Sequence, residues 1–276
     1  MTIRPPTAAD EAPLARAARW AFAITWIAIG AAVLLTGRPG PIFAPLPPLF
    51  AAHAAPIARL CGCVVLFGGI GLLWRRTVAA AAGLLLVHLL GWFMLGRLRL
   101  VVSSPGVEAS YQACGESMVL IAGVWVLYAG FARRTDRWWG YAGAAGGLRA
   151  ARALYGLALL AFGLSHFVYL GLTAPLVPRW LPWHEGFAYA TGAAYLLAGL
   201  AVLLGRRARL AATLAALQMA GFTALVWVPR IAHRGASLDS IDEFTVSWCL
   251  TVASCLVTAS YGRGRSHSFD SPVEIR

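Results

Sequence analysis

The sequence has no lysine and few charged residues of any kind. Only 12% of its 276 residues are charged, whereas soluble domains carry about 25%. The hydrophobic class makes up 59% of the chain, and the mean hydropathy is +0.70. A water-soluble fold cannot hide so much apolar surface. The composition therefore excludes a soluble catalytic domain and predicts an integral membrane protein.

Cysteines and the common catalytic motifs are also scarce. Five cysteines in apolar surroundings are too few for a disulfide scaffold or a zinc site. Walker loops, dinucleotide glycine fingerprints and Gly-x-Ser-x-Gly elbows are missing, so we predict no metal site and no known catalytic motif. Cys61 or Cys63 could pair with Cys114 on an oxidising outer face. The alternative is that these are small buried thiols at helix contacts.

Long apolar runs bounded by charge, Pro and Gly predict an all-α bundle of about eight transmembrane spans. Each run is close to the roughly 20 residues that cross a bilayer as a helix, and none alternates with the period of a strand. We read Trp20 to Thr36 as a retained helix and not as part of a signal peptide. The expected spans are Trp20–Thr36, Pro56–Trp74, Thr77–Gly96, Ser117–Phe131, Ala153–Gly171, Phe187–Leu204, Leu210–Val228 and Phe244–Tyr261.

The net charge of +12 comes from short arginine clusters between the apolar runs. Because these clusters form no basic stripe or domain, nucleic acid is not an expected partner; the lipid bilayer is. If the N-terminus is inside, sixteen of the 23 basic residues fall on the cytoplasmic side. The positive-inside rule then predicts a multi-pass protein of the cytoplasmic (inner) membrane, with both termini inside.

The two halves of the chain resemble each other. Ala44-Pro45-Leu46-Pro47-Pro48 recurs as Ala174-Pro175-Leu176-Val177-Pro178, and the Arg75-Arg76 hairpin recurs as Arg206-Arg207. Each half has four spans and starts on the same side, so we expect two parallel repeats. The predicted layout is a cytoplasmic N-terminal segment (1–19), a diverged first module (20–132), a linker (133–152), a second module (153–261) and a cytoplasmic tail (262–276).

The second module is similar to the DoxX-like family of four-helix membrane proteins. The resemblance rests on Gly163-Leu164-Ser165-His166-Phe167, Val177-Pro178-Arg179-Trp180-Leu181-Pro182 and Tyr189-Ala190-Thr191-Gly192, with the Arg206-Arg207 hairpin after them. The first module matches only through the repeat. The chain departs from the family pattern at Tyr195, where an acidic residue is usual. The resemblance implies a quinone-linked or accessory membrane subunit of a redox system, with a redox enzyme subunit as partner.

His88 and His166 are the two imidazoles well inside the expected spans. Polar groups in a membrane are costly and usually face a bundle interior or a cavity. Four readings stay open: interhelical hydrogen bonding, a quinone or proton-handling site, axial ligation of one haem by the pair, and metal binding. We expect His166 to line an outer-leaflet cavity with Arg179, His184 and Glu185 from the following loop; His88 ranks second.

The outer face gathers further charged residues. They would form either a solvated rim or a polar vestibule suited to a quinone headgroup or a small organic acid. The alternatives to a redox role are a small-solute transporter or exporter and a structural membrane partner without a ligand. The residues of this face are Glu108, Glu116, His184, Glu185, Asp239, Asp242 and Glu243, with Arg97, Arg99, Arg179, Arg230 and Arg234.

Overall fold

The computed structural model describes residues 11–43, 46–132, 140–234 and 237–264. The side chains of residues 233, 234, 263 and 264 lie outside this description. The expected N-terminal segment up to residue 10, the linker residues 133–139, the tail from residue 265 and the side chain of Arg234 therefore lie outside the described residues. All further statements concern the described part of the chain.

The described chain folds into helices, and eight of them are long and apolar enough to cross a membrane. The all-α transmembrane bundle expected from the sequence is thereby confirmed. The elements are α1 (Pro13–Thr36), η2 (Pro48–His53), α2 (Ala54–Gly71), α3 (Val78–Trp92), η3 (Phe93–Arg97), α4 (Leu98–Ser103), α5 (Glu108–Phe131), α6 (Ala145–Val168), α7 (Leu170–Thr173), η5 (Ala174–Leu176), α8 (His184–Leu203), α9 (Ala208–Phe222), η6 (Thr223–Trp227), α10 (Val228–Arg234), α11 (Leu238–Ser260) and η7 (Tyr261–Gly264).

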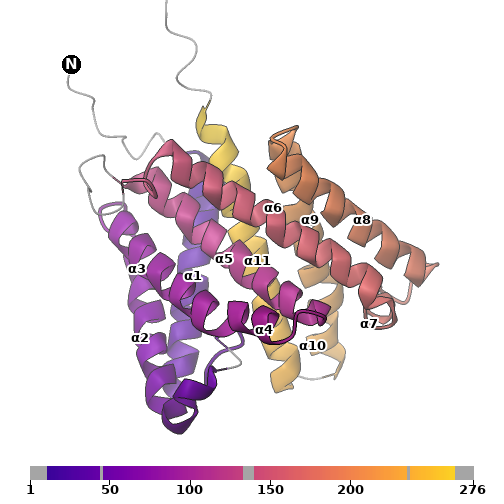
Figure 1. The fold of residues 1–276 in the computed structure, drawn as a ribbon, viewed down its shortest axis with the longest axis horizontal. Coiled ribbons are helices and arrows are strands. Elements are labelled where there is room, and N and C mark those ends of the chain that lie inside the picture. The colour runs from indigo at the N-terminus through magenta and orange to yellow at the C-terminus, as the bar shows by residue number, and fades with distance from the viewer. Residues whose placement is uncertain (1–10, 44–45, 133–139, 235–236, 265–276) are drawn as a thin grey trace, which may run out of the picture.

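Successive spans run in opposite directions, so α1 begins and α11 ends at the same end of the bundle (Figure 1). Helices α1, α5, α6 and α11 form the centre. Helix α5 packs against both α6 and α11, and α1 packs against α11. The pair α2 and α3 covers one flank, and the pair α8 and α9 covers the other. We refer to the end with the chain termini as the arginine-rich end, and to the other as the outer end.

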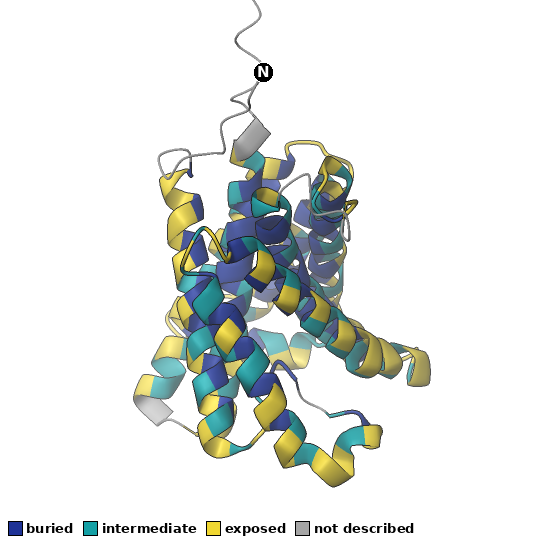
Figure 2. Ribbon diagram, turned by 90° about the vertical axis from the view of Figure 1, so that its left-hand side faces the viewer, coloured by how far each residue is buried: buried dark blue, intermediate teal, exposed yellow. Residues whose placement is uncertain are grey.

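The outward faces of the helices carry exposed leucine, phenylalanine and valine side chains (Figure 2). Leu60 and Phe67 on α2 and Leu197 on α8 are examples. An apolar surface of this extent is stable only against lipid tails. The exposure pattern thus supports a multi-pass membrane protein.

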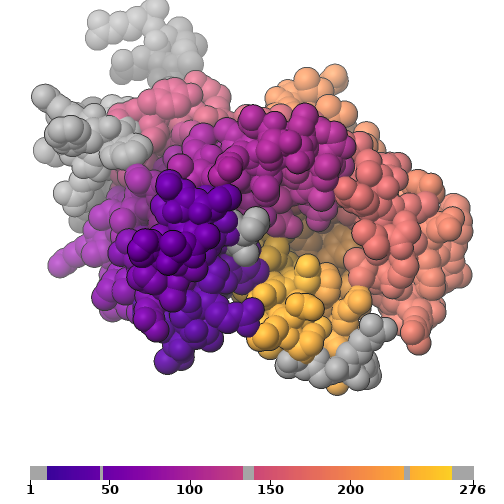
Figure 3. Space-filling model, turned by 60° about the horizontal axis from the view of Figure 1, so that its bottom comes forward, coloured from indigo at the N-terminus to yellow at the C-terminus, as the bar shows by residue number. Residues whose placement is uncertain are grey.

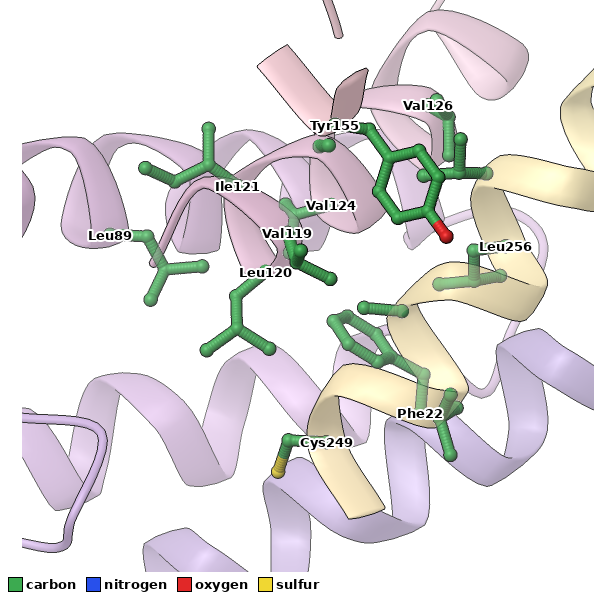
Figure 4. Packing of buried hydrophobic residues seen from close by; sticks show 14 of the residues in the cluster. Phe22, Leu89, Val119, Leu120, Ile121, Val124, Val126, Tyr155, Cys249 and Leu256 are labelled. Atoms are coloured by element: carbon green, nitrogen blue, oxygen red, sulfur yellow. The ribbon is translucent and has the colours of Figure 1, made fainter. Parts of the chain in front are cut away.

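The centre of the bundle is closely packed. Phe22 from α1, Ile121 from α5, Tyr155 from α6 and Leus from α11 belong to one buried cluster (Figure 4). Phe22 is 1% exposed and Tyr155 is 0% exposed. This cluster fills the space between the four central helices and holds both halves of the chain in one body.

The spans differ from the sequence prediction mainly at their polar ends. Helix α5 begins at Glu108 and not at Ser117, and α6 begins at Ala145 and not at Ala153. The apolar-run criterion stops at polar residues such as Gln112 and Glu116, but a helix continues wherever another helix covers its polar face. Ser165 of α6 covers this face of α5, where it bonds Glu108.

Corresponding helices of the two halves begin at a constant separation. The starts of α2 and α8, of α3 and α9, and of α5 and α11 are each 130 residues apart. The third span of each half also contains a π-helical turn, η3 and η6, again 130 residues apart. These bounds agree with the sequence repeat, while the superposition of the two halves by one rotation stays a prediction.

Candidate functional site

A cavity of about 560 Å³ opens in the second half of the chain. Figure 3 shows the outer end hollowed between α5 (magenta), the segment around α7 and α8 (salmon), and α10 and α11 (orange to yellow). Its size is within the range of small-molecule sites, roughly 300 to 1,000 Å³. We call it the second-half cavity. Its polar lining residues are Gln112, Glu116, Ser165, His166, Tyr169, Thr173, Thr191, Tyr195, Gln218, Glu243 and Ser247; the rest of the lining is apolar or aromatic.

The segment after α6 covers part of this cavity. Helix α6 ends at Val168, and the short helices α7 and η5 follow. Leu172, Leu176 and Pro178 from this segment line the cavity. The Tyr169 hydroxyl accepts a hydrogen bond of 3.2 Å from the Ala109 backbone N–H, which ties the segment to the start of α5. The cover of the cavity is therefore mainly apolar.

His166 stands in the wall of this cavity with one ring nitrogen engaged. Its Nδ1 lies 2.8 Å from the carbonyl oxygen of Phe162, one turn earlier on α6. Because a carbonyl oxygen only accepts, Nδ1 carries the proton and Nε2 of the neutral ring is an acceptor. The ring packs between Tyr195 at 5.6 Å and Phe222 at 5.8 Å, measured between ring centroids. Both of these residues also line the cavity, so the imidazole sits within an aromatic wall.

Tyr195 and Gln218 add hydroxyl and amide groups beside the imidazole. The side chain of Gln218 hydrogen-bonds Tyr195, and its Nε2 donates to the carbonyl oxygen of Thr191 at 3.0 Å. This bond joins α9 to α8. Gln218 therefore positions the Tyr195 hydroxyl from the neighbouring helix.

Acidic groups line the other side of the cavity. Glu116 on α5 and Glu243 on α11 both face it, and the two carboxyl groups interact electrostatically with each other and with Arg97 or Arg230. Deeper in the wall, Ser165 bonds Glu108 Oε1 at 2.7 Å and Gln112 Oε1 at 3.0 Å. The cavity is thus richer in hydrogen-bond acceptors than in donors.

Hydroxyl groups join the π-helical turn of the seventh span to α11. Thr223 Oγ1 lies 2.7 Å from Ser247 Oγ and 3.1 Å from Thr251 Oγ1. In this turn the Val228 N–H bonds the Thr223 carbonyl, five residues back. Such turns occur frequently at functional sites. Here the turn supplies Leu225, Val226 and Trp227 to the cavity wall.

The structure separates His166 from the three loop residues expected beside it. Arg179 and His184 line a depression of about 510 Å³ with Arg230, and His184 and Glu185 line another of about 460 Å³ with Trp183. The second-half cavity includes none of the three. The predicted grouping is corrected, because the loop folds as α7 and η5 and turns its apolar residues over His166.

His88 lies in the first half among aromatic side chains. Its ring packs on Phe43 at 5.4 Å and on Trp92 at 6.4 Å between centroids, and its buried Nε2 has no hydrogen-bond partner among the described residues. Phe43 is 3% exposed and fills the space beside it. The cavity around His166 does not include His88. The two histidines therefore stand in separate groups, which gives no support to one haem held by both.

The other sequence candidates are placed as follows. All five cysteines are free, so the alternative of a pair between Cys61 or Cys63 and Cys114 does not occur. Among the residues described, no group of three or more His, Cys, Asp and Glu side chains could hold a metal ion. Sequence reasoning missed Tyr195 as a cavity residue and overlooked Gln218. A glutamine inside an apolar span is the signal that could have found the latter.

The fold and the cavity define a multi-pass helical membrane protein with an amphipathic pocket in its second half. Comparison with known families matches residues 155–243 to a domain of unknown function, DUF8561. The match runs from the middle of α6 to the start of α11 and so includes His166, Tyr195 and Gln218. No curated protein and no solved structure matches the chain.

Proposed function

We propose that the protein binds a quinone or quinol from the membrane in the second-half cavity and acts as an accessory membrane subunit of a redox system. The observation that carries this proposal is the neutral His166 beside the Tyr195 hydroxyl, in an otherwise apolar cavity within the bundle. The DoxX-like resemblance of the same residues adds support.

The residues fit both ends of such a ligand. A quinol hydroxyl can donate to Nε2 of His166, and a quinone carbonyl can accept from the Tyr195 hydroxyl. Phe162, Phe222 and Leu225 offer apolar surface for the ring and the first part of an isoprenoid chain. The excess of acceptors in the lining, with Glu116 and Glu243, favours the quinol, which carries two donors.

The chemistry of the bound group would be the exchange of electrons and protons between quinone and quinol. In this proposal an enzyme subunit in the same membrane supplies or removes the electrons. The residues of this chain hold the headgroup, shield it from water and accept a hydrogen bond at His166 Nε2. The proposed localisation is the cytoplasmic membrane, with both termini inside, on the basis of the arginine asymmetry.

A passage for solutes is the alternative from another class. The buried side chains of Tyr155, Leu159 and Val252 occupy the bundle between the cavity and the arginine-rich end. A cavity closed at one end favours binding over transport. A structural role without a ligand would leave the cavity to lipid tails.

The test is to identify the molecules that copurify with the full chain. Protein extracted in a mild detergent is washed, and bound lipids and quinones are measured by mass spectrometry. We expect about one quinone or quinol per chain, reduced in Tyr195→Phe, which removes only the hydroxyl. A quinone content equal to that of an unrelated membrane protein would refute the proposal.

A further inference from the structure

The arginine-rich end of the second half carries a basic depression of about 930 Å³. It lies between the start of α6, the α8–α9 hairpin and the end of α11, which meet at the upper side of Figure 1. We call it the basic depression. Its charged lining residues are Arg149, Arg152, Arg207 and Arg209, and its lining contains no Asp or Glu from the described residues.

The corresponding end of the first half neutralises its arginines internally. Arg19 donates to both carboxylate oxygens of Glu11 at 3.1 Å, and Arg75 donates to the same carboxylate at 3.0 Å. Arg19 also donates to the Leu72 carbonyl at 2.7 Å. One acidic residue thus anchors both arginines, and the cluster needs no external anion.

The second half repeats the arginines but lacks this acid. Arg16 and Arg19 recur as Arg149 and Arg152, 133 residues later, and the same shift places Ala144 where Glu11 stands. Arg152 instead donates to the Ser260 hydroxyl at 3.0 Å and lies over the Tyr261 ring at 4.0 Å. Arg149, Arg207 and Arg209 are exposed. The positive charge of this site therefore calls for an anion from outside the described fold.

Apolar side chains beside the arginines indicate what kind of anion fits. Leu203, Leu204 and Leu210 line the same depression, and Leu204 is 70% exposed. A free phosphate would gain nothing from these leucines. A phospholipid would place its phosphate among the guanidinium groups and its acyl chains along the exposed leucines.

We propose that the basic depression binds the headgroup of an anionic phospholipid. Guanidinium groups pair with phosphate oxygens in bidentate geometry, and basic pockets between spans bind such headgroups. The bound lipid would take the place that Glu11 holds in the first half and would join α6 to the α8–α9 hairpin.

The experiment measures lipid binding to the full chain by native mass spectrometry. Delipidated protein is titrated with phosphatidylglycerol and with phosphatidylcholine of identical acyl chains. We expect phosphatidylglycerol to bind at least about tenfold more tightly. The double variant Arg149→Gln/Arg209→Gln should weaken its binding about thirtyfold, from the usual contribution of two basic residues near a lipid surface.

Two further variants make the test specific. Arg16→Gln/Arg76→Gln removes two exposed arginines from the same end of the first half and should change binding less than twofold. Ala144→Glu supplies the missing acid and should weaken phosphatidylglycerol binding while the protein remains monodisperse. Equal affinity for the two lipids, or equal losses in both double variants, would overturn the proposal. Complete displacement of the lipid by millimolar inorganic phosphate would also overturn it, because the site would then recognise free phosphate.

Discussion

The Nδ1 atom of His166 donates a hydrogen bond of 2.8 Å to the carbonyl oxygen of Phe162. This bond holds the imidazole in one tautomer and leaves Nε2 as an acceptor in the wall of the second-half cavity. Backbone anchoring of one ring nitrogen is a common way to set the role of the other. The proposed ligand site depends on that arrangement and on the empty volume beside it.

The volume of the cavity can be tested with a pair of glycines. Gly221 lines the cavity and Gly91 is 130 residues earlier, and a Cβ at either position would meet no atom within 4 Å. We expect Gly221→Leu to occupy part of the cavity and to reduce quinone retention severalfold. Because glycine costs about 1 kcal/mol in a helix interior, the protein should not lose stability. Copurified quinone and the thermal unfolding midpoint are the measurements.

Gly91→Leu is the matched control for this substitution. It makes the same change in the first half, so retention should stay at the level of the unmodified protein. A fall of retention in Gly91→Leu alone would place the ligand in the first half.

The Glu11–Arg19 pair predicts a stability effect at the arginine-rich end. Both side chains are 3% exposed, and removal of one partner leaves a buried charge without its counter-ion. Glu11→Gln should therefore destabilise the fold by about 3 kcal/mol. Glu185→Gln, a change at an exposed glutamate, should shift stability by less than about 0.5 kcal/mol. Denaturant unfolding in detergent compares the two, and equal effects would refute the structural role of the pair.

A close helix crossing predicts a second stability effect. A Cβ at Gly30 would lie 2.6 Å from the Leu66 backbone nitrogen and 2.8 Å from the Gly62 carbonyl oxygen. Only a shift of α1 away from α2 can relieve such contacts, so Gly30→Ala should cost about 1 to 3 kcal/mol. Gly221→Ala, where the added Cβ is free, serves as control. An unchanged unfolding midpoint for Gly30→Ala would show that the crossing is looser than the structure describes.

The sequence predicted the number and type of the spans, because long apolar runs have one stable form in a bilayer. It placed the ends less well. Glu108, Gln112 and Glu116 interrupt the apolar run, yet α5 continues through them, since they bond α6 or face the second-half cavity. Burial of polar residues between helices is a tertiary property that a hydropathy pattern does not contain.

The composition of the site was predictable only in part. His166 was identified because an imidazole in an apolar span is rare. Its neighbours Tyr195 and Phe222 come from two other helices, and their position depends on how those helices pack. Arg179, His184 and Glu185 are nearer in sequence, but they line other depressions. Proximity along the chain was therefore a poor guide to proximity in space.

The predicted orientation has a direct test. The described chain begins and ends at the arginine-rich end of the bundle, and the positive-inside rule places that end in the cytoplasm. Reporter fusions to the N- and C-termini should both report a cytoplasmic location. A fusion at the α7 to α8 connection should report the opposite side. A C-terminal fusion on the outer side would contradict the predicted topology.

The central claim is that His166 holds a membrane quinone or quinol in the second-half cavity. The most direct measurement is the quinone content of purified His166→Ala beside that of His88→Ala, with monodispersity and unfolding midpoint recorded for both. The account predicts at least about a tenfold loss of quinone in His166→Ala, from lost hydrogen bonding and ring contacts worth about 1.5 kcal/mol. It predicts full retention in His88→Ala and folded protein in both. Equal quinone content in the two variants, or loss of folded protein in His166→Ala alone, would contradict it.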